Sequence, residues 1–279
     1  MAWQTWIGGT STAFDTGTNW ASGTAPGNGD SWVMSKDAVR SIESNLDQSG
    51  DDYGKIIIEK GCTKNLGTGT GAGMFMCACG EFVHNGSGYA YLKAAHATAD
   101  IDDIIVNSPR LYIEGGTAAL TLDDDGTAEN VRVRVLQGWC AFSSDATGTT
   151  TKIYVDGPRA ALTTQTATGT FTRLVVSNGW AYTQNALTNA HVHGGHLIVA
   201  DGAVGTILTV SGGRCDYNSD DTLPWALVTG GLLDFDNDMR NKTVSLLETT
   251  PSGRYKAGNH ITFTTENAIA GTKVQSYGV

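Results

Sequence analysis

Several aspartates between residues 216 and 238 have a spacing that could support chemistry on a polysaccharide. Hydrolysis of a glycosidic bond needs two carboxyl groups set across a groove, or a carboxylate beside basic groups. The candidates are Asp216, Asp220, Asp221, Asp234, Asp236 and Asp238. Within "DFDND" (234–238) the aspartates alternate, so they would share one face of a strand. A solvated turn after "GGLL" accounts for the same residues, and we predict no catalytic role for them.

Three histidines in "HVHGGH" (191–196) form a second candidate constellation. On a strand His191 and His193 would share a face, and His196 follows after two glycines. Three imidazoles at this spacing could bind zinc or nickel. The glycine pair also falls at a corner of the repeat described below, which gives the segment a structural role. We therefore predict no metal at these histidines.

The cysteines predict free thiols. They are Cys62, Cys77, Cys79, Cys140 and Cys215. The count is odd, and the start "MAWQTWIGG" lacks the basic and apolar regions of a signal peptide, so we expect a reducing compartment. Cys77 and Cys79 would share a strand face and could bind a metal together. Two buried, small thiols are the preferred interpretation.

The remaining motifs predict neither an enzyme nor a cofactor. The segment "LDDDG" (122–126) could ligate a cation, but it lacks the longer spacing of a calcium loop and is typical of an acidic turn. The glycines of "GTGTGAG" (67–73) are not followed by Lys-Ser or Lys-Thr, as a phosphate-binding loop requires. The sequence contains no nucleophile motif and no dinucleotide fingerprint.

A strand-like pattern that ends in glycine recurs along the chain and predicts the elements that position these groups. Its instances are "LYIEGG" (111–116), "VRVLQGW" (133–139), "IYVDG" (153–157), "LVVSNGW" (174–180), "HVHGGHLIV" (191–199), "LTVSGG" (208–213) and "ALVTGGLLDF" (226–235). Their last glycines are spaced by 22, 19, 22, 16, 18 and 18 residues. A single-stranded parallel β-helix of about 20 residues per coil would place one such corner in each coil. We therefore predict an all-β solenoid of about eight to ten coils.

The dipeptide Asn178-Gly179 distinguishes this solenoid from a hairpin meander. Asn-Gly is a strong hairpin signal, but both residues also tolerate the left-handed backbone of a sharp corner. Because the same strand-then-glycine pattern recurs, we predict a coil corner. Trp139 and Trp180 directly follow equivalent glycines. We expect them to pack along one face, and an exposed aromatic strip that binds sugar is the alternative.

Three segments are predicted along the chain: an N-terminal cap and attachment segment (1–50), the β-helix (51–241), and a C-terminal cap or oligomerisation segment (242–279) that could also be a final coil. Within the β-helix, 54–61 and 101–116 are predicted coil strands, whereas 65–74 and 81–92 are predicted loops. In the cap, Val39, Ile42 and Leu46 have helical spacing, so an amphipathic helix over 35–47 is an open alternative.

The net charge and the lengths of the apolar runs indicate which partners the protein is expected to lack. The net charge is −10 and the pI is near 4.9, so an acidic surface should repel nucleic acid. No apolar run approaches the roughly 18 residues that a transmembrane helix needs. We expect neither a nucleic-acid nor a membrane partner.

The N-terminal fifty residues depart from the repeat and carry a resemblance to a known family. The matching residues are Trp6, Gly8, Gly9, Thr10, Asn19, Trp20, Pro26, Gly29 and Asp30, followed by "SWVM" (31–34). This segment, roughly residues 3–50, resembles the one that opens many β-helical virion proteins of tailed bacteriophages. Related forms occur in autotransporter-like passengers. Autotransporter passengers need an export signal, and we expect none at the start "MAWQTWIGG". A phage virion protein needs no such signal, so the phage proteins are the preferred resemblance.

The resemblance implies a non-enzymatic structural protein, most simply a capsid decoration or cement protein bound to the major capsid protein in the virion. Such a protein assembles in the host cytoplasm. Side-by-side solenoids would close as a homotrimer. Trp3, Trp6, Asn19 and Trp20 are the expected contact residues, and Trp6 and Trp20 could also plug the solenoid end. The alternatives are a tail fibre or tailspike that binds or cleaves host glycan, and an adhesin-like surface protein.

Overall fold

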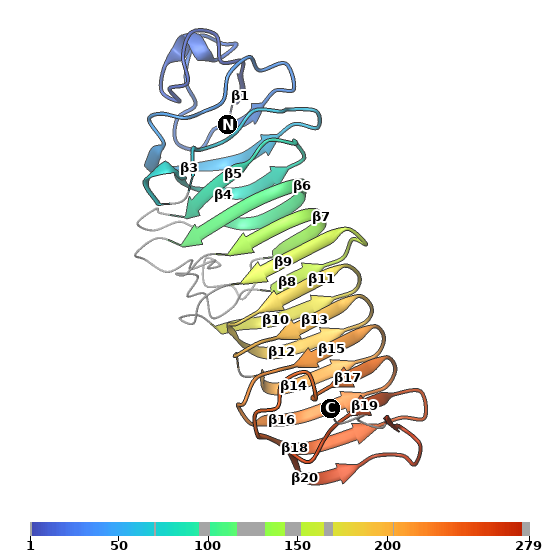
Figure 1. The fold of residues 1–279 in the computed structure, drawn as a ribbon. Helices are drawn as coiled ribbons and strands as arrows, with labels where there is room; N and C mark the ends of the chain where they lie inside the picture. The colour runs from blue at the N-terminus through green and yellow to red at the C-terminus, as the bar shows by residue number, and fades with distance from the viewer. Residues whose placement is uncertain are drawn as a thin grey trace. The chain divides into compact units, whose positions relative to one another are not determined.

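The chain folds as a β-solenoid of stacked parallel strands, about 8 turns with roughly 19 residues each, as predicted (Figure 1). The computed structural model describes residues 2–69, 71–94, 101–115, 132–142, 152–164, 170–202 and 204–274. None of these residues lies in an α-helix. The chain divides into two compact units, Met1–Thr151 and Lys152–Val279, which are described separately.

The N-terminal unit begins with an irregular cap and continues as a parallel ladder. Its strands are β1 (Trp3–Trp6), β2 (Ser31–Met34), β3 (Asp47–Ile58), β4 (Phe75–His84), β5 (Ala90–Ala94), β6 (Ile101–Gly115) and β7 (Arg132–Phe142), with two 3-10 turns, η1 (Gly17–Asn19) and η2 (Gly71–Gly73). Each of β1, β2 and β3 pairs in parallel with the next strand, β4 pairs with both β5 and β6, and β6 pairs with β7. The coil strands predicted at 54–61 and 101–116 are confirmed within β3 and β6.

The C-terminal unit has two faces, each a parallel ladder. The first face contains β8 (Lys152–Val155), β10 (Thr170–Val176), β12 (Ala186–Val192), β14 (Val204–Val210), β16 (Leu223–Val228), β18 (Lys242–Thr249) and β20 (Ile261–Asn267). The second face contains β9 (Ala160–Thr164), β11 (Trp180–Thr183), β13 (His196–Val199), β15 (Arg214–Tyr217), β17 (Leu232–Asp234), β19 (Arg254–Lys256) and β21 (Lys273–Val274). Consecutive strands of a face pair in register, and Figure 1 shows β12, β14, β16 and β18 stacked one after another.

Asn178-Gly179 is a coil corner, as predicted. The strand before it, β10, pairs with β8 and β12, whereas the strand after it, β11, pairs with β9 and β13. Neither strand pairs with the other, so the chain does not turn back on itself. On the second face Trp180 lies opposite His196, His196 opposite Arg214, and Arg214 opposite Leu232. These steps of 16, 18 and 18 residues reproduce the spacing of the glycines.

Glycine is required at this corner for two reasons. Gly179, Gly195, Gly213 and Gly231 have φ of 75°, 67°, 66° and 69°, in the left-handed region that side chains disfavour. The corners also stack so closely that a Cβ on Gly213 would lie 2.3 Å from the Gly195 carbonyl oxygen. The recurrence of glycine in the sequence therefore reflects both backbone conformation and contact between coils.

The core of the C-terminal unit consists of equivalent side chains stacked along the coils. One such column contains Val155, Val176, Val192, Val210 and Val228, which lie opposite one another in register and are all buried. β-Branched residues pack well on a pleated strand, and each coil contributes the same shape to the column. The alternating residues of the same strands point outward, which leaves them available for other roles.

The cap is built around aromatic side chains that close the first coil. Phe14 contacts Trp20, Trp32, Tyr53 and Phe75 with ring centroids 5.0–6.1 Å apart. Trp6 packs edge-on against Trp20 at 5.3 Å. All six rings are at most 2% exposed. Trp6 and Trp20 therefore do plug the end of this unit.

Three polar side chains of the cap core, Trp6, Asn19 and Trp20, are hydrogen-bonded to backbone atoms, whereas the buried Trp32 indole nitrogen has no partner. The Trp20 indole nitrogen donates to the Phe14 carbonyl at 2.7 Å, and that of Trp6 donates to the Arg40 carbonyl at 2.9 Å. Asn19 is fully buried. Its side-chain oxygen accepts from the amides of Thr10 and Ser11, each at 2.8 Å, and its nitrogen donates to Ala13 O at 2.8 Å. Asn19 thus fixes the loop that crosses over the aromatic core.

The structure excludes one alternative that the sequence left open and corrects part of one prediction. Residues 35–47 form no helix, because the Ile42 amide donates to Asn65 O at 3.0 Å, in an isolated parallel bridge between Ile42 and Leu66. The segment 81–92 is also not a loop throughout. Its ends belong to β4 and β5, and only the glycine-rich turn between them is irregular. A Cβ on Gly88 would lie 2.1 Å from Lys64 O, so this turn is another close-packed corner.

The C-terminal segment continues the coil through residue 274. Its strands β18 to β21 extend the two ladders without a change of direction. The last rung is polar, because Glu266 lies opposite the buried Leu247 and accepts a hydrogen bond from the Tyr255 hydroxyl. A charged group at this position protects a sheet edge from pairing with other chains. The cap and oligomerisation roles of this segment stay predictions.

Candidate functional site

A network of charged side chains lies on the second face of the C-terminal unit, across β13, β15 and β17. His196 Nε2 lies 2.8 Å from Asp216 Oδ2. Arg214 donates from Nε to Asp216 Oδ1 at 2.5 Å and from Nη2 to Asp234 Oδ2 at 3.0 Å. The parallel register creates this network, because Asp216 lies directly opposite Asp234 and Arg214 directly opposite His196. Two of the six aspartates predicted from the sequence are thus brought together.

The network shields its carboxylates and exposes its donors. The side chains of Asp216 and Asp234 are 6% and 4% exposed, whereas those of His196 and Arg214 are 34% and 42% exposed. The hydrogen bond to Asp216 raises the pKa of the Arg214 guanidinium. Each carboxylate is occupied by a cation, so neither is arranged as a free acid or base for bond cleavage. Their evident action is to hold Arg214 in a fixed orientation.

The other four aspartates lie in separate settings. The Asp236 side chain is only 5% exposed, accepts from the Gly258 amide at 2.5 Å, and lies 3.8 Å from both Lys256 Nζ and His260 Nε2. Asp238 and Asp220 pair with Arg240, while Asp221 accepts from Ser219. The aspartates of "DFDND" therefore do not line one open face together.

Arg240 binds three loops on successive coils. Its guanidinium donates to Ala200 O at 3.1 Å, to Asn218 O at 2.6 Å and to Asp201 Oδ1 at 3.0 Å, and it also pairs with Asp238. The carbonyl oxygens come from equivalent turns one coil apart. This geometry uses the planar fork of arginine, which a lysine cannot reproduce.

We expect Arg240→Ala to lower the free energy of unfolding of the C-terminal unit by about 1–2 kcal/mol, since it removes charge-assisted bonds at a partly exposed site. Urea titration followed by circular dichroism would measure the change. The matched control is Lys36→Ala, which removes an exposed ion pair with Asp37 and should leave stability nearly unchanged. Equal effects of the two substitutions would contradict the role given to Arg240.

The corner splits the three histidines of "HVHGGH" between the two faces. His191 on β12 stacks with His193, which begins the corner, with ring centroids 6.2 Å apart, and His193 Nδ1 lies 2.7 Å from Ser211 Oγ. His196 lies beyond the corner and pairs with Asp216. Across the parts of the chain that the structure describes, no group of three or more His, Cys, Asp or Glu residues could hold a metal.

Acidification should destabilise the C-terminal unit, and His191 should account for part of the loss. Partial burial, helped by the charge of Arg173, lowers the pKa of His191 below 6.5. The unfolded chain then binds a proton more readily than the folded one, so stability is complete above pH 6.5 and falls as the pH drops below it. Melting temperatures between pH 7.5 and 5.5 would show a smaller fall for His191→Thr, the residue that Thr209 supplies one coil later. An unchanged fall would contradict this assignment.

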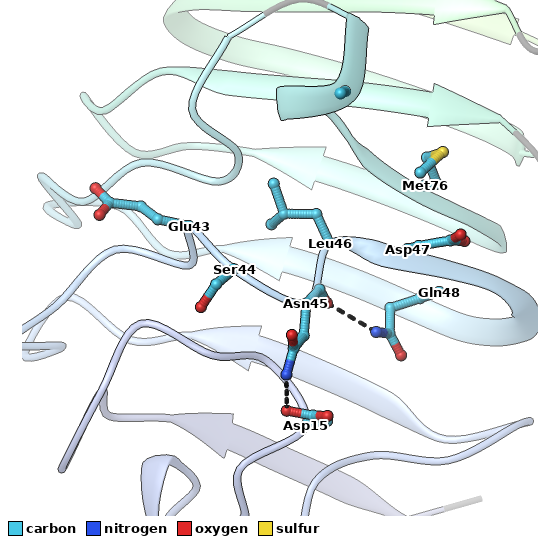
Figure 2. Close-up of a pocket in the computed structure, with 9 residues that line it drawn as sticks. Asp15, Glu43, Ser44, Asn45, Leu46, Asp47, Gln48 and Met76 are labelled. Atoms are coloured by element: carbon cyan, nitrogen blue, oxygen red, sulfur yellow. Dashed lines mark hydrogen bonds between the residues drawn. The ribbon is translucent and has the colours of Figure 1, made fainter.

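A hollow of about 490 Å³ lies beside the cap in the N-terminal unit (Figure 2). Its lining residues are Asp15, Glu43, Ser44, Asn45, Leu46, Asp47, Gln48, Ala72 and Met76. Asn45 has φ of 53°, and its side chain donates to Asp15. The three carboxylates are exposed, and hydrogen bonds from Ser49 lower the pKa of Asp47. The hollow is therefore a shallow surface feature of an irregular turn, lined by solvated carboxylates, and we propose no ligand for it.

Of the four expected contact residues, three are inside the cap. Trp6, Asn19 and Trp20 are buried, so they shape the cap and cannot touch a partner without its rearrangement. Trp3 is 56% exposed and stays a candidate. Ile7 and Val39, which the sequence did not single out as contact residues, are also exposed. Their backbones are bonded, with the Val39 amide donating to Ile7 O at 3.0 Å.

The remaining sequence candidates have structural settings. All five cysteines are buried and outside any disulfide, including Cys77 and Cys79 on β4, and burial raises the pKa of Cys140 and Cys215. The acidic segment 122–126 lies outside the described residues. Trp139 belongs to the N-terminal unit and Trp180 to the C-terminal unit, and each follows a glycine with positive φ.

Comparisons with protein-family models, with curated proteins and with solved structures found no match to this chain. Within the described ranges, no helix combines the length and the apolar character that crossing a membrane requires.

Proposed function

We propose that this protein is a non-enzymatic structural component of a tailed-phage virion, a decoration or cement protein that binds the major capsid protein through its N-terminal cap. The proposal rests on the resemblance of residues 3–50 and on one structural observation. The cap carries three exposed apolar side chains, Trp3, Ile7 and Val39, which in this proposal form the attachment patch.

This apolar patch is costly for a protein in water, and burial against a partner would offset the cost. Val39 is 62% exposed, although other apolar residues of the same segment, Ile42 and Leu46, are buried. The patch is also held firmly. Arg40, next to Val39, donates from its guanidinium to Gly8 O and Gly9 O at 2.6 and 2.8 Å. A preordered surface loses little conformational entropy on binding.

Deleting residues 1–50 would not test this role, because the deletion removes buried core residues. Surface substitutions separate attachment from folding. We expect the pair Trp3→Ser and Val39→Ser to reduce occupancy on purified capsids at least about tenfold, as the loss of about 1.4 kcal/mol of binding energy would. Co-sedimentation with capsids that lack the protein would measure occupancy.

The control is Met239→Ser, which removes an exposed apolar side chain from the C-terminal unit; Met239 is 74% exposed. Normal occupancy of the cap variant with unchanged melting would contradict attachment through the patch. Loss of occupancy in the control as well would show that apolar exposure in general, rather than the cap, governs binding.

The proposal includes a homotrimer formed by solenoids side by side. Each solenoid would bury one flat face in the assembly, and a three-fold axis would close it. Light scattering during size-exclusion chromatography would give a mass near three times 29.3 kDa. A monomer mass at micromolar concentration would exclude a stable trimer before attachment.

A further inference from the structure

The second face of the C-terminal unit carries outward side chains that the attachment role does not use. Parallel register aligns Trp180, His196 and Arg214 in one outward column. A second column contains Tyr182, Ile198, Asp216 and Asp234. We call these seven residues the second-face strip. Neighbouring strands are about 4.8 Å apart, so the strip extends about 14 Å along the coils from β11 to β17.

One end of the strip is aromatic. Trp180 and Tyr182 stack on β11 with ring centroids 6.1 Å apart and planes inclined by 21°, and both are partly exposed. The Tyr182 hydroxyl accepts from Gln184 Nε2 at 2.9 Å, which limits its rotation. Partly exposed aromatic rings with a fixed polar tip suit ligands that have both apolar and polar faces.

Apart from Ile198, the rest of the strip is polar, and its hydrogen-bond donors are held in place. Arg214 is held by two buried carboxylates and His196 by one of them, as described above. Such preorganised donors bind a ligand without first losing side-chain entropy. Arg214 has five N–H groups, and the network uses donors on Nε and Nη2. The guanidinium therefore keeps donor capacity for a ligand on its exposed side.

The net negative charge of the strip disfavours polyanionic ligands. Asp216 and Asp234 outweigh the charge of Arg214, and the protein as a whole has a net charge of −10. A densely charged polyanion such as single-stranded nucleic acid, which also stacks on aromatic rings, would be repelled. An oligosaccharide combines apolar ring faces with hydroxyl groups and has little or no charge.

We propose that the second-face strip binds an oligosaccharide, with a sugar ring against Trp180 and hydroxyl groups bonded to His196 and Arg214. This site is distinct from the attachment patch and lies in the other unit. A protein attached by its N-terminal cap could use it to hold a particle on a glycan-covered surface.

The test is binding of the full chain to an array of bacterial and animal oligosaccharides, followed by calorimetry with the tightest glycan captured. Trp180→Ala should weaken that binding at least about tenfold. This variant should fold, since Ala161 occupies the equivalent position one coil earlier. The matched control is Trp225→Leu on the first face, where Leu246 occupies the equivalent position one coil later, and its affinity should equal that of the unaltered chain.

Three results would overturn the proposal: no glycan captured from the array, equal affinity of the Trp180→Ala and unaltered chains, or displacement of the glycan by a single-stranded thymidine oligonucleotide that binds more tightly. None of these results bears on capsid attachment, which is measured separately with the cap variants. The two proposals can therefore fail independently.

Discussion

Trp20→Ala is expected to lower the free energy of unfolding of the N-terminal unit by about 3–5 kcal/mol. Trp20 is 2% exposed, packs edge-on against Trp6, Phe14 and Trp32, and donates its indole hydrogen to Phe14 O. Alanine would leave a cavity at the solenoid end and a backbone carbonyl without its partner. The surrounding rings, Phe14, Trp32 and Phe75, also pack against one another, so they should move only partly into the cavity.

Denaturant titration of the full chain, followed by tryptophan fluorescence, would measure this loss. Trp3→Ala is the matched control, because it removes the same side chain from an exposed position and should cost less than about 0.5 kcal/mol. If both substitutions had the same small effect, the cap would not be the packed plug that the structure describes.

The second large effect is expected for Gly213→Ala, which should destabilise the C-terminal unit by about 2–5 kcal/mol. The left-handed backbone at φ of 66° costs a side chain about 1–2 kcal/mol. Contact with the Gly195 carbonyl adds about 1–3 kcal/mol, because stacked coils leave the backbone little room to move. The corners at Gly195 and Gly231 would be strained in turn.

Gly23→Ala separates these two causes. Gly23 has φ of 80°, but a Cβ there would meet no atom within 4 Å. Only the conformational cost of about 1–2 kcal/mol should then appear. Melting curves of the two variants should therefore differ, with Gly213→Ala the less stable. A smaller loss for Gly213→Ala than for Gly23→Ala would contradict close stacking of the corners.

Much of the fold could be predicted because the corner is a local requirement. Gly179, Gly195, Gly213 and Gly231 each need a left-handed backbone, so their spacing in the sequence reports the coil length directly. The structure of the cap could not be predicted in this way. Asn19 is buried because it bonds to the loop at residues 10–13, and no local sequence pattern specifies the path of that loop.

Helical spacing at Val39, Ile42 and Leu46 was misleading for a physical reason. Two of the three side chains do enter the core, but they do so from an irregular segment whose amides bond to another coil. Burial at three- or four-residue intervals is necessary for an amphipathic helix and is not sufficient.

The charged network of His196, Arg214, Asp216 and Asp234 could have been predicted from the repeat, although the sequence analysis did not predict it. Asp216 and Asp234 each lie three residues after an aligned corner glycine, and His196 and Arg214 each lie one residue after one. Superposing the repeats on their glycines would have placed these groups in adjacent columns. What no alignment of repeats shows is that the carboxylates are buried while the donors are exposed.

The central claim is that the chain is a structural component of a phage particle. The most direct test is its copy number per purified particle from the source, measured by quantitative mass spectrometry against the major coat protein. The decoration role predicts hundreds of copies, in a simple ratio to the coat protein. A handful of copies would place the chain at a tail or vertex and contradict decoration, and complete absence from particles would contradict a virion role.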